Sequence, residues 1–426
     1  MRVRAALALL SVVALAISAC GGSSARPFRV GVLSDCYGLF AGANELNLGA
    51  AELPLVERGA KPVGRNPSAG VAAVAVANRR VELLVGCVAG NEDVIPEARR
   101  LVEEEGAAAL VGPLNPEEGM ALRAYASEQP NVAFLIQPSG AAEATLREPL
   151  LNVFRFAPDA AQTSAGLGAY AFHTLGWRRA AIVADDVPYG WEEAAGFVAE
   201  FCSLGGHVVA REWAQLGTDP VAAAARVPAS ADGVYLGAAV SPMQRFLQRY
   251  ATIRHGLAGK LVSNVALLVD RSVTSSARGV VVGGAPPFEP TRAVRSFAAA
   301  FAKAFPGIPA TAPINQLSMP YATGVEAVLE ALERSHGADG GAFMHALARV
   351  RIDSPLGPMR LDGHRQAVVT NYLSQVVPVG KTFTLRTIRT VPNVTQSFGG
   401  YFDSSSAPAS ETSPPCVVRT PPAWAR

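Results

Sequence analysis

The most specific chemistry in the sequence lies at Cys20. Residues 17–19, with the letters ISA, match a bacterial lipobox, in which small side chains admit the signal peptidase. The thiol of Cys20 is then the atom that receives a diacylglyceryl group. Upstream, Arg2 and Arg4 precede the almost wholly apolar segment 5–16, which is the layout of a secretory signal. The alternative is an ordinary signal peptide followed by a free cysteine.

This pattern predicts an exported chain. We expect residues 1–20 to be a lipoprotein signal peptide and residues 21–27, which begin GGSS, to be a flexible tether. Acyl chains on Cys20 would hold the protein on the outer face of the cell membrane or in the periplasm. No later stretch reaches the roughly 20 apolar residues that a membrane-spanning helix requires.

Patterns for catalysis and for metal binding are missing from the sequence. The segment Gly380-Lys381-Thr382 resembles the end of a Walker A loop, but Gln375 stands where the first glycine is needed. No GxSxG, CxxC, HExxH or EF-hand pattern occurs, and the six histidines are scattered. We therefore expect no enzyme activity, no metal and no cofactor.

The pair Asp185 and Asp186 is the arrangement that most resembles an acid/base or metal site. Adjacent residues at the end of a strand point in opposite directions, so the pair favours a loop or hinge role.

The charge of the mature chain argues against a nucleic-acid partner. Removal of the first 20 residues takes two of the 37 basic residues and none of the 35 acidic ones, which leaves 35 of each. A neutral chain lacks the basic footprint that binds phosphates. Its length of about 400 residues suggests two domains rather than one.

Alternating strands and helices begin at Phe28. Continuous apolar runs predict strands that are buried on both faces, as in a parallel sheet: Phe28–Leu33, Val81–Gly86, Ala107–Val111 and Val132–Ile136. Amphipathic segments at 97–105 and 117–128 predict the intervening helices. This βαβ series indicates right-handed crossovers.

The same alternation restarts near residue 160. We expect a helix over 162–175, and then strands at Ala180–Ala184, His207–Ala210, Gly233–Leu236, Lys260–Val262 and Gly279–Val282. Apolar residues at helical spacing predict further helices at 194–201, 243–250, 294–301 and 325–332. β-like segments follow at 367–377 and 382–391. The fold class is therefore α/β, with two doubly wound, Rossmann-like sheets.

The order of these elements resembles the leucine/branched-chain amino-acid type of periplasmic binding protein, a class I binding fold that serves ABC importers. The resemblance covers the chain from Phe28 to about Val377. Five stretches carry it: RVGVLS at 29–34, VGPL at 111–114, VFRFAPD at 153–159, LGWRRAAIV with the following DD and YG at 175–190, and SPLGPMRL at 354–361.

The resemblance implies two discontinuous lobes joined by a three-segment hinge. The implied divisions are residues 27–156 with 287–354 for lobe 1, residues 157–286 with 355–400 for lobe 2, and residues 401–426 for a Ser/Pro-rich tail. We expect the tail to be poorly ordered unless Cys416 ties it down.

Ligands of open parallel sheets bind beyond the carboxyl ends of the strands. The loops there are 34–40, 113–118 and 137–142 in lobe 1, and 185–190, 237–241 and 263–266 in lobe 2. Helices begin just after several of these loops, and their positive ends would suit a ligand carboxylate. The residues that we expect to contact the ligand are Tyr37, Phe40, Asn115, Glu117, Ser139, Gly140, Ala141, Tyr189, Ala239 and Asn264.

The resemblance also shows where this chain departs from amino-acid binders. Hydroxyl groups expected in lobe 1 fall near Pro116 and Ala141, and an aromatic ring and an acid expected in lobe 2 fall near Ala239 and Asn264. Tyr189 matches the family pattern. Loss of the acid removes a charge-assisted contact to an ammonium group. The ligand is therefore equally an amino acid, an amide, a urea-like compound, a carboxylate or an aromatic compound.

Each candidate has a structural alternative. Glu117, with Glu118, is suited to the N-terminus of a helix, and Asn264 to a helix cap. Tyr189 would equally pack a turn. Ser139 would brace its own loop, and Tyr37 and Phe40 would cover the sheet.

The remaining cysteines are Cys36, Cys87, Cys202 and Cys416, which allow three pairings. Cys36 and Cys87 follow the first two strands, which are neighbours in a 2-1-3 order, and this predicts a bridge between them. Cys202 would either bridge to Cys416 or remain a buried thiol.

We interpret the chain as a monomeric solute receptor that captures a small polar molecule for an ABC permease and its ATPase subunits. The alternative is a regulatory or sensory lipoprotein that uses the same fold to control a membrane or cell-wall partner.

Overall fold

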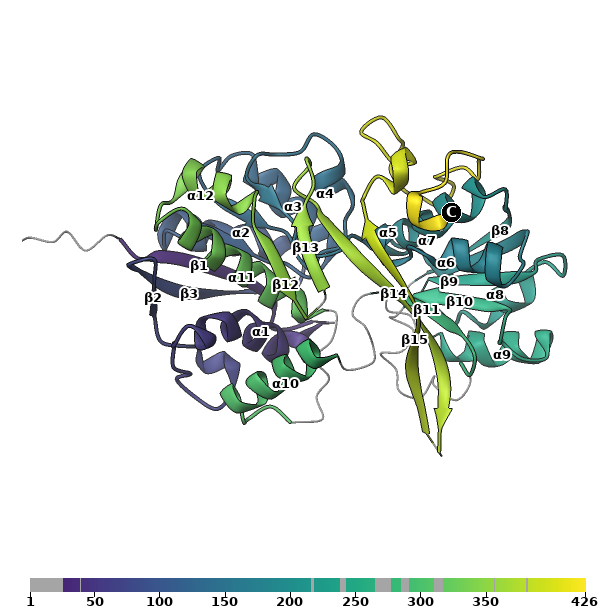
Figure 1. Cartoon of the computed structure of the whole chain (residues 1–426), viewed down its shortest axis with the longest axis horizontal. Helices are drawn as coiled ribbons and strands as arrows, with labels where there is room; N and C mark the ends of the chain where they lie inside the picture. The colour runs from purple at the N-terminus through teal and green to yellow at the C-terminus, as the bar shows by residue number, and fades with distance from the viewer. Residues whose placement is uncertain are drawn as a thin grey trace, which may run out of the picture.

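The computed structural model describes residues 26–38, 40–215, 218–237, 243–264, 277–284, 291–309, 317–355, 357–380 and 382–426. Two α/β bodies lie side by side in Figure 1, each built around a sheet with helices packed against it. The predicted fold class is confirmed. The signal segment and Cys20 lie outside the described residues.

The first sheet has the strand order β2-β3-β1-β4-β5-β6. Its strands are β1 (Phe28–Asp35), β2 (Val74–Val76), β3 (Arg79–Val88), β4 (Ala109–Val111), β5 (Ala133–Leu135) and β6 (Val153–Phe154). All neighbours pair in parallel except β2, which pairs antiparallel with β3. The predicted neighbours of β1 are therefore confirmed. We call this sheet and its helices the first lobe.

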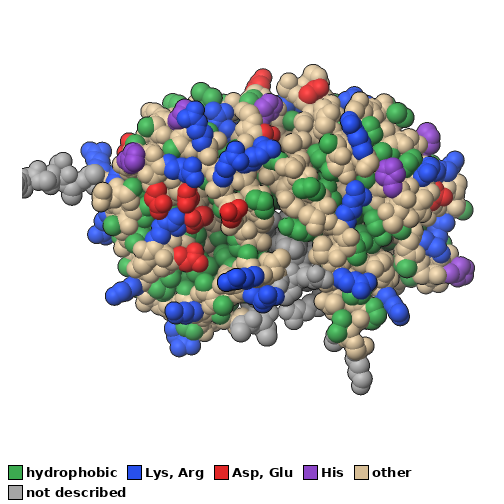
Figure 2. All heavy atoms as spheres, in the orientation of Figure 1, with side chains coloured by type: hydrophobic (Ala, Val, Ile, Leu, Met, Phe, Trp, Pro, Cys, Tyr) green, Lys and Arg blue, Asp and Glu red, His purple; other side chains and the backbone are tan. Residues whose placement is uncertain are grey.

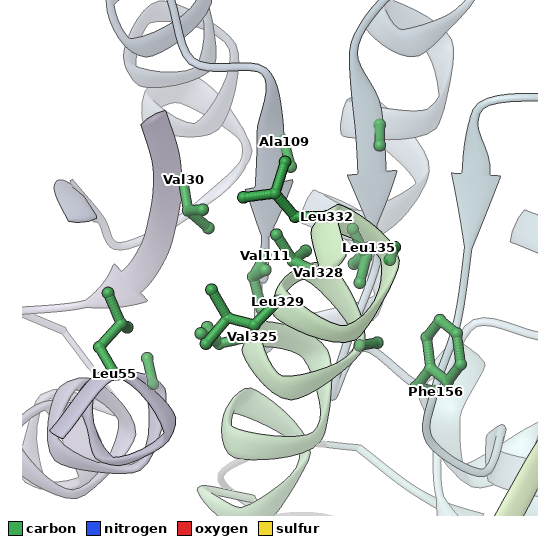
Figure 3. Close-up of a cluster of buried hydrophobic side chains, with 14 of the residues drawn as sticks. Val30, Leu55, Ala109, Val111, Leu135, Phe156, Val325, Val328, Leu329 and Leu332 are labelled. Atoms are coloured by element: carbon green, nitrogen blue, oxygen red, sulfur yellow. The ribbon is translucent and has the colours of Figure 1, made fainter. Parts of the chain in front are cut away.

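Seven helices accompany this sheet within the described residues. They are α1 (Asn44–Glu57), α2 (Asn91–Arg99), α3 (Pro116–Ala126), α4 (Glu143–Leu146), α10 (Arg292–Ala304), α11 (Met319–Arg334) and α12 (Gly340–Leu347). Figure 3 shows α11 against one face of the sheet, where Val325 and Val328 meet Val111 and Leu135. Burial of such side chains contributes roughly 1.5–3 kcal/mol each. A late segment of the chain thus completes the first core.

The second sheet has the order β12-β13-β14-β11-β10-β9-β7-β8, with β15 paired to β14. Its strands are β7 (Arg179–Asp185), β8 (His207–Ala214), β9 (Gly233–Gly237), β10 (Leu261–Asn264), β11 (Val281–Gly284), β12 (Arg351–Ser354), β13 (Gly357–Leu361), β14 (Ala367–Val379) and β15 (Thr382–Val394). Strands β7 to β11 pair in parallel, and the later strands join antiparallel. We call this sheet and its helices the second lobe.

The helices of the second lobe are α5 (Ala160–Thr163), α6 (Leu167–Ala169), α7 (Pro188–Ser203), α8 (Val221–Arg226) and α9 (Gln244–Arg254). The predicted helix over 162–175 is wrong as a single element. Gly166 has φ +92° and interrupts it, and the backbone N–H of Gly166 donates to Glu200 Oε1 at 2.6 Å. A π-helical turn at Tyr170–Thr174 ends the segment. The left-handed conformation of Gly166, and its hydrogen bond to the buried Glu200 carboxyl, thus break the helix that the apolar spacing predicts.

The chain passes between the lobes three times. It leaves the first sheet after β6, returns to the first lobe with α10, whose Phe301 packs on Leu53, and passes back through β12 and β13. Ile352 of β12 packs in the first core although β12 pairs with a strand of the second sheet. The residue boundaries of the lobes remain a prediction.

Both disulfide pairings are present. Cys36 and Cys87 have Cα atoms 5.4 Å apart at the ends of β1 and β3, and Cys202 and Cys416 have Cα atoms 5.3 Å apart. The second bridge ties the C-terminal segment to α7.

The C-terminal segment folds back over the second lobe. Trp424 Nε1 donates to Glu200 Oε1 at 2.5 Å, and Tyr401 Oη donates to the Pro415 carbonyl at 2.8 Å. Figure 1 shows this segment against α7 and close to α4 of the first lobe. The condition set by the sequence is met, because Cys416 holds the tail. Among the described helices, none is both long and apolar enough to cross a bilayer.

Candidate functional site

The site lies where the carboxyl ends of the two sets of parallel strands meet. In the first lobe β1 ends at Asp35, and the loops after β4 and β5 lead to α3 and α4. In the second lobe β7 ends at Asp185 and β10 ends at Asn264. Loops at this edge of a parallel sheet form the usual ligand crevice of doubly wound folds.

Gly140 and Tyr189 bring the two lobes into direct contact at this edge. A Cβ added to Gly140 would lie 2.8 Å from Cε2 of the Tyr189 ring, so the ring packs on the bare backbone. The Gly140 carbonyl also accepts the backbone N–H of Ala160 at 2.9 Å. Glycine is required here, because a larger residue would push the two lobes apart.

Glu193 is the centre of the polar cluster of the second lobe. It lies one helical turn after Tyr189 in α7, and its side chain hydrogen-bonds to Tyr189 and Asn264. The carboxyl of Asp185 lies close enough for its charge to raise the pKa of Glu193. Glu193 is 1 % exposed and Asn264 is fully buried. Burial raises the pKa of Glu193 well above its ordinary value, because the ionised form loses its hydration.

Asp35 and Glu118 form a second carboxyl cluster in the first lobe. Burial, together with the charge of the neighbouring Asp35, raises the pKa of Glu118 to about 8. Burial likewise raises the pKa of Asp35 to about 6. Both carboxyls lie near Tyr321 of α11, whose hydroxyl donates to the Leu33 carbonyl at 2.9 Å. Two buried carboxyls therefore lie along the same edge of the first sheet. No cation is among the groups that most influence their pKa values.

Ser139 connects the two clusters. Its backbone N–H donates to the Pro113 carbonyl at 3.2 Å, and its hydroxyl lies beside Gly119, which follows Glu118 in α3. A Cβ added to Gly119 would clash with the Ser139 Oγ atom, so the loop and the helix are in close contact. The next residue, Gly140, is the one that carries the Tyr189 ring.

Three of the predicted contact residues lie at the surface or at its margin. Tyr37 is 50 % exposed and its hydroxyl donates to Asp93 Oδ2 at 2.6 Å, while Phe40 is partly buried at the start of a short 3₁₀ turn. Glu117 is exposed in the first turn of α3.

Asn115 has a structural role in addition to its place at the edge. Its side chain caps α3 by accepting the Glu117 backbone N–H at 3.0 Å. Such a cap stabilises a helix by about 1 kcal/mol.

The remaining predicted residues divide between hinge and site. Ala141 is buried and its carbonyl accepts a hydrogen bond from the Arg155 guanidinium. Asn264 donates to Glu193, and Ala239 lies outside the described residues. Asp185 is fully buried, whereas Asp186 accepts the Trp191 indole N–H at 3.1 Å, so the two adjacent aspartates do not act as a pair.

Sequence reasoning missed Glu193 and Asp35. The acid that the resemblance expects near Asn264 is absent from that position, and Glu193 of α7 accepts a hydrogen bond from the Asn264 amide. The spacing of Tyr189 and Glu193 was the available signal, because residues i and i+4 share a helix face. Asp35 gave no signal of its own, since it ends an ordinary apolar strand.

The chemistry of this arrangement is recognition by hydrogen-bond acceptors. Within the described residues, no group of three or more His, Cys, Asp or Glu side chains is arranged to hold a metal ion. The polar groups are carboxyls, hydroxyls and an amide that converge from two lobes, as in a ligand crevice.

Comparison with known proteins agrees with the fold described above. The model of a family described as periplasmic binding proteins matches residues 27–381. No curated protein matches the chain.

Solved structures share the fold over most of the chain. An ABC transporter substrate-binding protein from Sphaerobacter thermophilus is 24% identical, with a TM-score of 0.75, and the match covers 89% of this chain and 99% of that one. A solute-binding protein from Rhodopseudomonas palustris HaA2, in complex with p-hydroxybenzoic acid, is 18% identical, with a TM-score of 0.74 and coverage of 87% and 98%. A leucine-binding protein from Thermotoga maritima is 15% identical, with a TM-score of 0.69 and coverage of 85% and 98%.

Proposed function

We propose that this chain, which belongs to the periplasmic binding protein family, is an extracytoplasmic solute receptor of an ABC importer. It would bind a small polar molecule between its lobes and deliver it to a permease with ATPase subunits. The similar solved structures include ABC transporter binding proteins for a benzoate and for leucine, which supports this reading.

One observation carries the proposal. The loop Ser139–Gly140 of the first lobe lies against Tyr189 of the second, and Glu193 and Asn264 gather behind that contact. A ligand placed there would touch both lobes, so its binding free energy would favour the closed conformation. Closure around a ligand is binding chemistry and requires no catalytic group.

A thermal-shift screen of the mature protein tests this function. A ligand that binds only the folded chain raises the melting temperature, by an amount that grows with its concentration relative to its Kd. A hit should also lower the radius of gyration in small-angle X-ray scattering. A broad screen without any hit would contradict the receptor function, and turnover of a hit would indicate an enzyme.

We further propose that Cys20 is acylated and anchors the protein to the membrane. Intact-mass analysis of protein from the membrane fraction should show acyl chains on an N-terminal Cys20. The variant Cys20→Ala should appear in the soluble fraction. A membrane-bound Cys20→Ala protein would contradict the anchor without affecting the ligand site.

Transport and regulation can be separated in cells. Deletion of the gene should abolish uptake of the hit compound if the receptor serves an importer. Normal uptake together with a changed cell-envelope response would favour the regulatory alternative.

A further inference from the structure

The carboxyl edge of the first sheet carries buried polar atoms without partners. Asp35, Asn47, Glu118 and Ser139 are each 3 % exposed or less. Among the described residues, no hydrogen-bond partner exists for Asp35 Oδ2, the Asn47 amide or Ser139 Oγ. The Glu118 carboxyl has no side-chain partner there, and the nearby Asn115 backbone N–H lowers its pKa without meeting hydrogen-bond geometry. Buried polar groups in folded proteins are almost always hydrogen-bonded, so each such group requires an explanation.

These atoms share one place in the fold. Asp35 ends β1, Asn47 lies in the first turn of α1, Glu118 lies in the first turn of α3, and Ser139 lies in the loop after β5. Carboxyl ends of parallel strands, and the helix starts that follow them, lie along the same edge of a sheet. The unpartnered set therefore lies along this edge of the sheet, with its two carboxyls close to Tyr321 of α11.

A continuous series of contacts joins this set to the second lobe. Glu118 precedes Gly119, whose backbone touches Ser139 Oγ, and Gly140 then supports the ring of Tyr189. Tyr189 hydrogen-bonds to Glu193, and the charge of Asp185 contributes to the raised pKa of Glu193. Carboxyls thus stand on both sides of the lobe contact.

The charge of this edge disfavours an anionic ligand. The positive end of α3 would attract a carboxylate, but Glu118 already occupies that first turn, with Asp35 beside it. At a pH above the pKa of Glu118, a ligand carboxylate would meet like charge at short range in a poorly hydrated site, which is unfavourable. A cation would satisfy the same atoms by charge-assisted hydrogen bonds.

We propose that the ligand carries an ammonium, amidinium or guanidinium group, which binds Asp35 and Glu118 of the first lobe, with Ser139 Oγ and Asn47 accepting further donors. This assignment rests on the proposed receptor function, because it names the ligand class of the same crevice. The atoms are covered in this conformation, and lobe opening would give the ligand access.

The first test is a thermal-shift screen in which charge is the variable. The mature, disulfide-bonded protein is tested at mildly alkaline pH with three cations, benzamidine, agmatine and butane-1,4-diamine. The anions benzoate and butyrate and the neutral benzamide and butyramide serve as matched compounds. We expect the largest shift from a cation. A larger shift from an anion or an amide would overturn the charge assignment and leave the receptor function standing, whereas no shift from any compound would count against both.

The second test uses the variant Glu118→Gln with the cation that gives the largest shift. Loss of the carboxylate should weaken calorimetric affinity by about tenfold or more, because one charge-assisted hydrogen bond is lost. The control Glu104→Gln removes the same charge from an exposed position in the first lobe and should leave affinity unchanged. A melting temperature at or above that of the wild type shows that Glu118→Gln folds. Unchanged affinity in the folded Glu118→Gln variant would overturn the proposal.

Discussion

Two buried polar regions of the molecule differ in how completely they are hydrogen-bonded. At the hinge, Gln366 accepts from Thr145 and Arg155 and donates to the Ala157 carbonyl and to Gln162, at 2.8–3.1 Å. At the crevice edge, Glu118 is as deeply buried and has no side-chain partner among the described residues. Burial is the same, so burial alone does not mark a site. The difference lies in the partners.

The comparison assigns different roles to the two regions. The hinge network joins Arg155 after β6, Gln162 of α5 and Gln366 before β14, so it fixes how the lobes are connected. A buried side chain whose donors and acceptors are all satisfied, as those of Gln366 are, confers rigidity and specificity. At the crevice edge, the proposed function assigns the unpartnered polar groups to a bound ligand. Substitutions in the two regions test this contrast.

Substitution Gln366→Leu should be the most damaging. It leaves the Thr145 hydroxyl, the Ala157 carbonyl and one N–H of Arg155 buried without this partner, and each unsatisfied group costs about 1–3 kcal/mol. We expect the free energy of unfolding to fall by about 4 kcal/mol in urea denaturation. A loss below about 1 kcal/mol would show that the hinge network is not structural.

The paired substitution Cys202→Ser with Cys416→Ser should come next. It releases the tail that lies beside the hinge, and loss of a native bridge typically costs 2–5 kcal/mol. We expect a loss of about 3 kcal/mol, measured by urea denaturation, with ligand affinity within about twofold of wild type. A large change in affinity would mean that the tail belongs to the site.

Substitution Glu118→Gln should have the opposite sign and a smaller size. Because the folded pKa of about 8 lies above the ordinary value of 4.5, the wild-type contribution of Glu118 is fully present below pH 4.5 and is lost as pH rises through 8. Asp93, Glu117 and Asp35 all raise this pKa through their charge.

The variant should therefore match wild type at acidic pH and exceed it in free energy of unfolding above pH 8, where the wild-type carboxyl must ionise in a buried position. Urea denaturation across this range is the measurement. A variant that is less stable than wild type at high pH would show that Glu118 has a partner that holds it in place.

Substitution Tyr189→Phe should have the smallest effect on affinity. It keeps the ring on Gly140 and removes the hydroxyl that hydrogen-bonds to Glu193. One hydrogen bond contributes about 1 kcal/mol, which corresponds to about a fivefold weaker affinity in calorimetry. Tyr189→Ala should weaken binding further, and unchanged affinity in both variants would place the ligand elsewhere.

The fold could be predicted from the sequence because its signals are local. Continuous apolar runs gave β1, β4 and β5, and strand order then placed Cys36 beside Cys87. The failed helix over 162–175 shows the limit, since Gly166 turns where a distant carboxylate, Glu200, accepts its N–H. A hydrogen bond between residues far apart in the sequence can break a helix, and the local pattern of apolar residues does not reveal it.

The site could be predicted only in part. Strand-end loops could be named in advance, and Gly140 of one lobe does meet Tyr189 of the other. The acids could not be placed, because Glu118 resembles a helix start and Asp35 resembles the end of a buried strand. Their importance depends on which partners are missing, and that is a property of the packed structure.

A crystal structure of the protein with the tightest-binding compound would show directly whether a cationic ligand binds between the lobes. We expect ligand density between Ser139–Gly140 and Tyr189–Glu193, with a cationic group within hydrogen-bond distance of Glu118 or Asp35. Density at another place, or a ligand that touches only one lobe, would contradict the account.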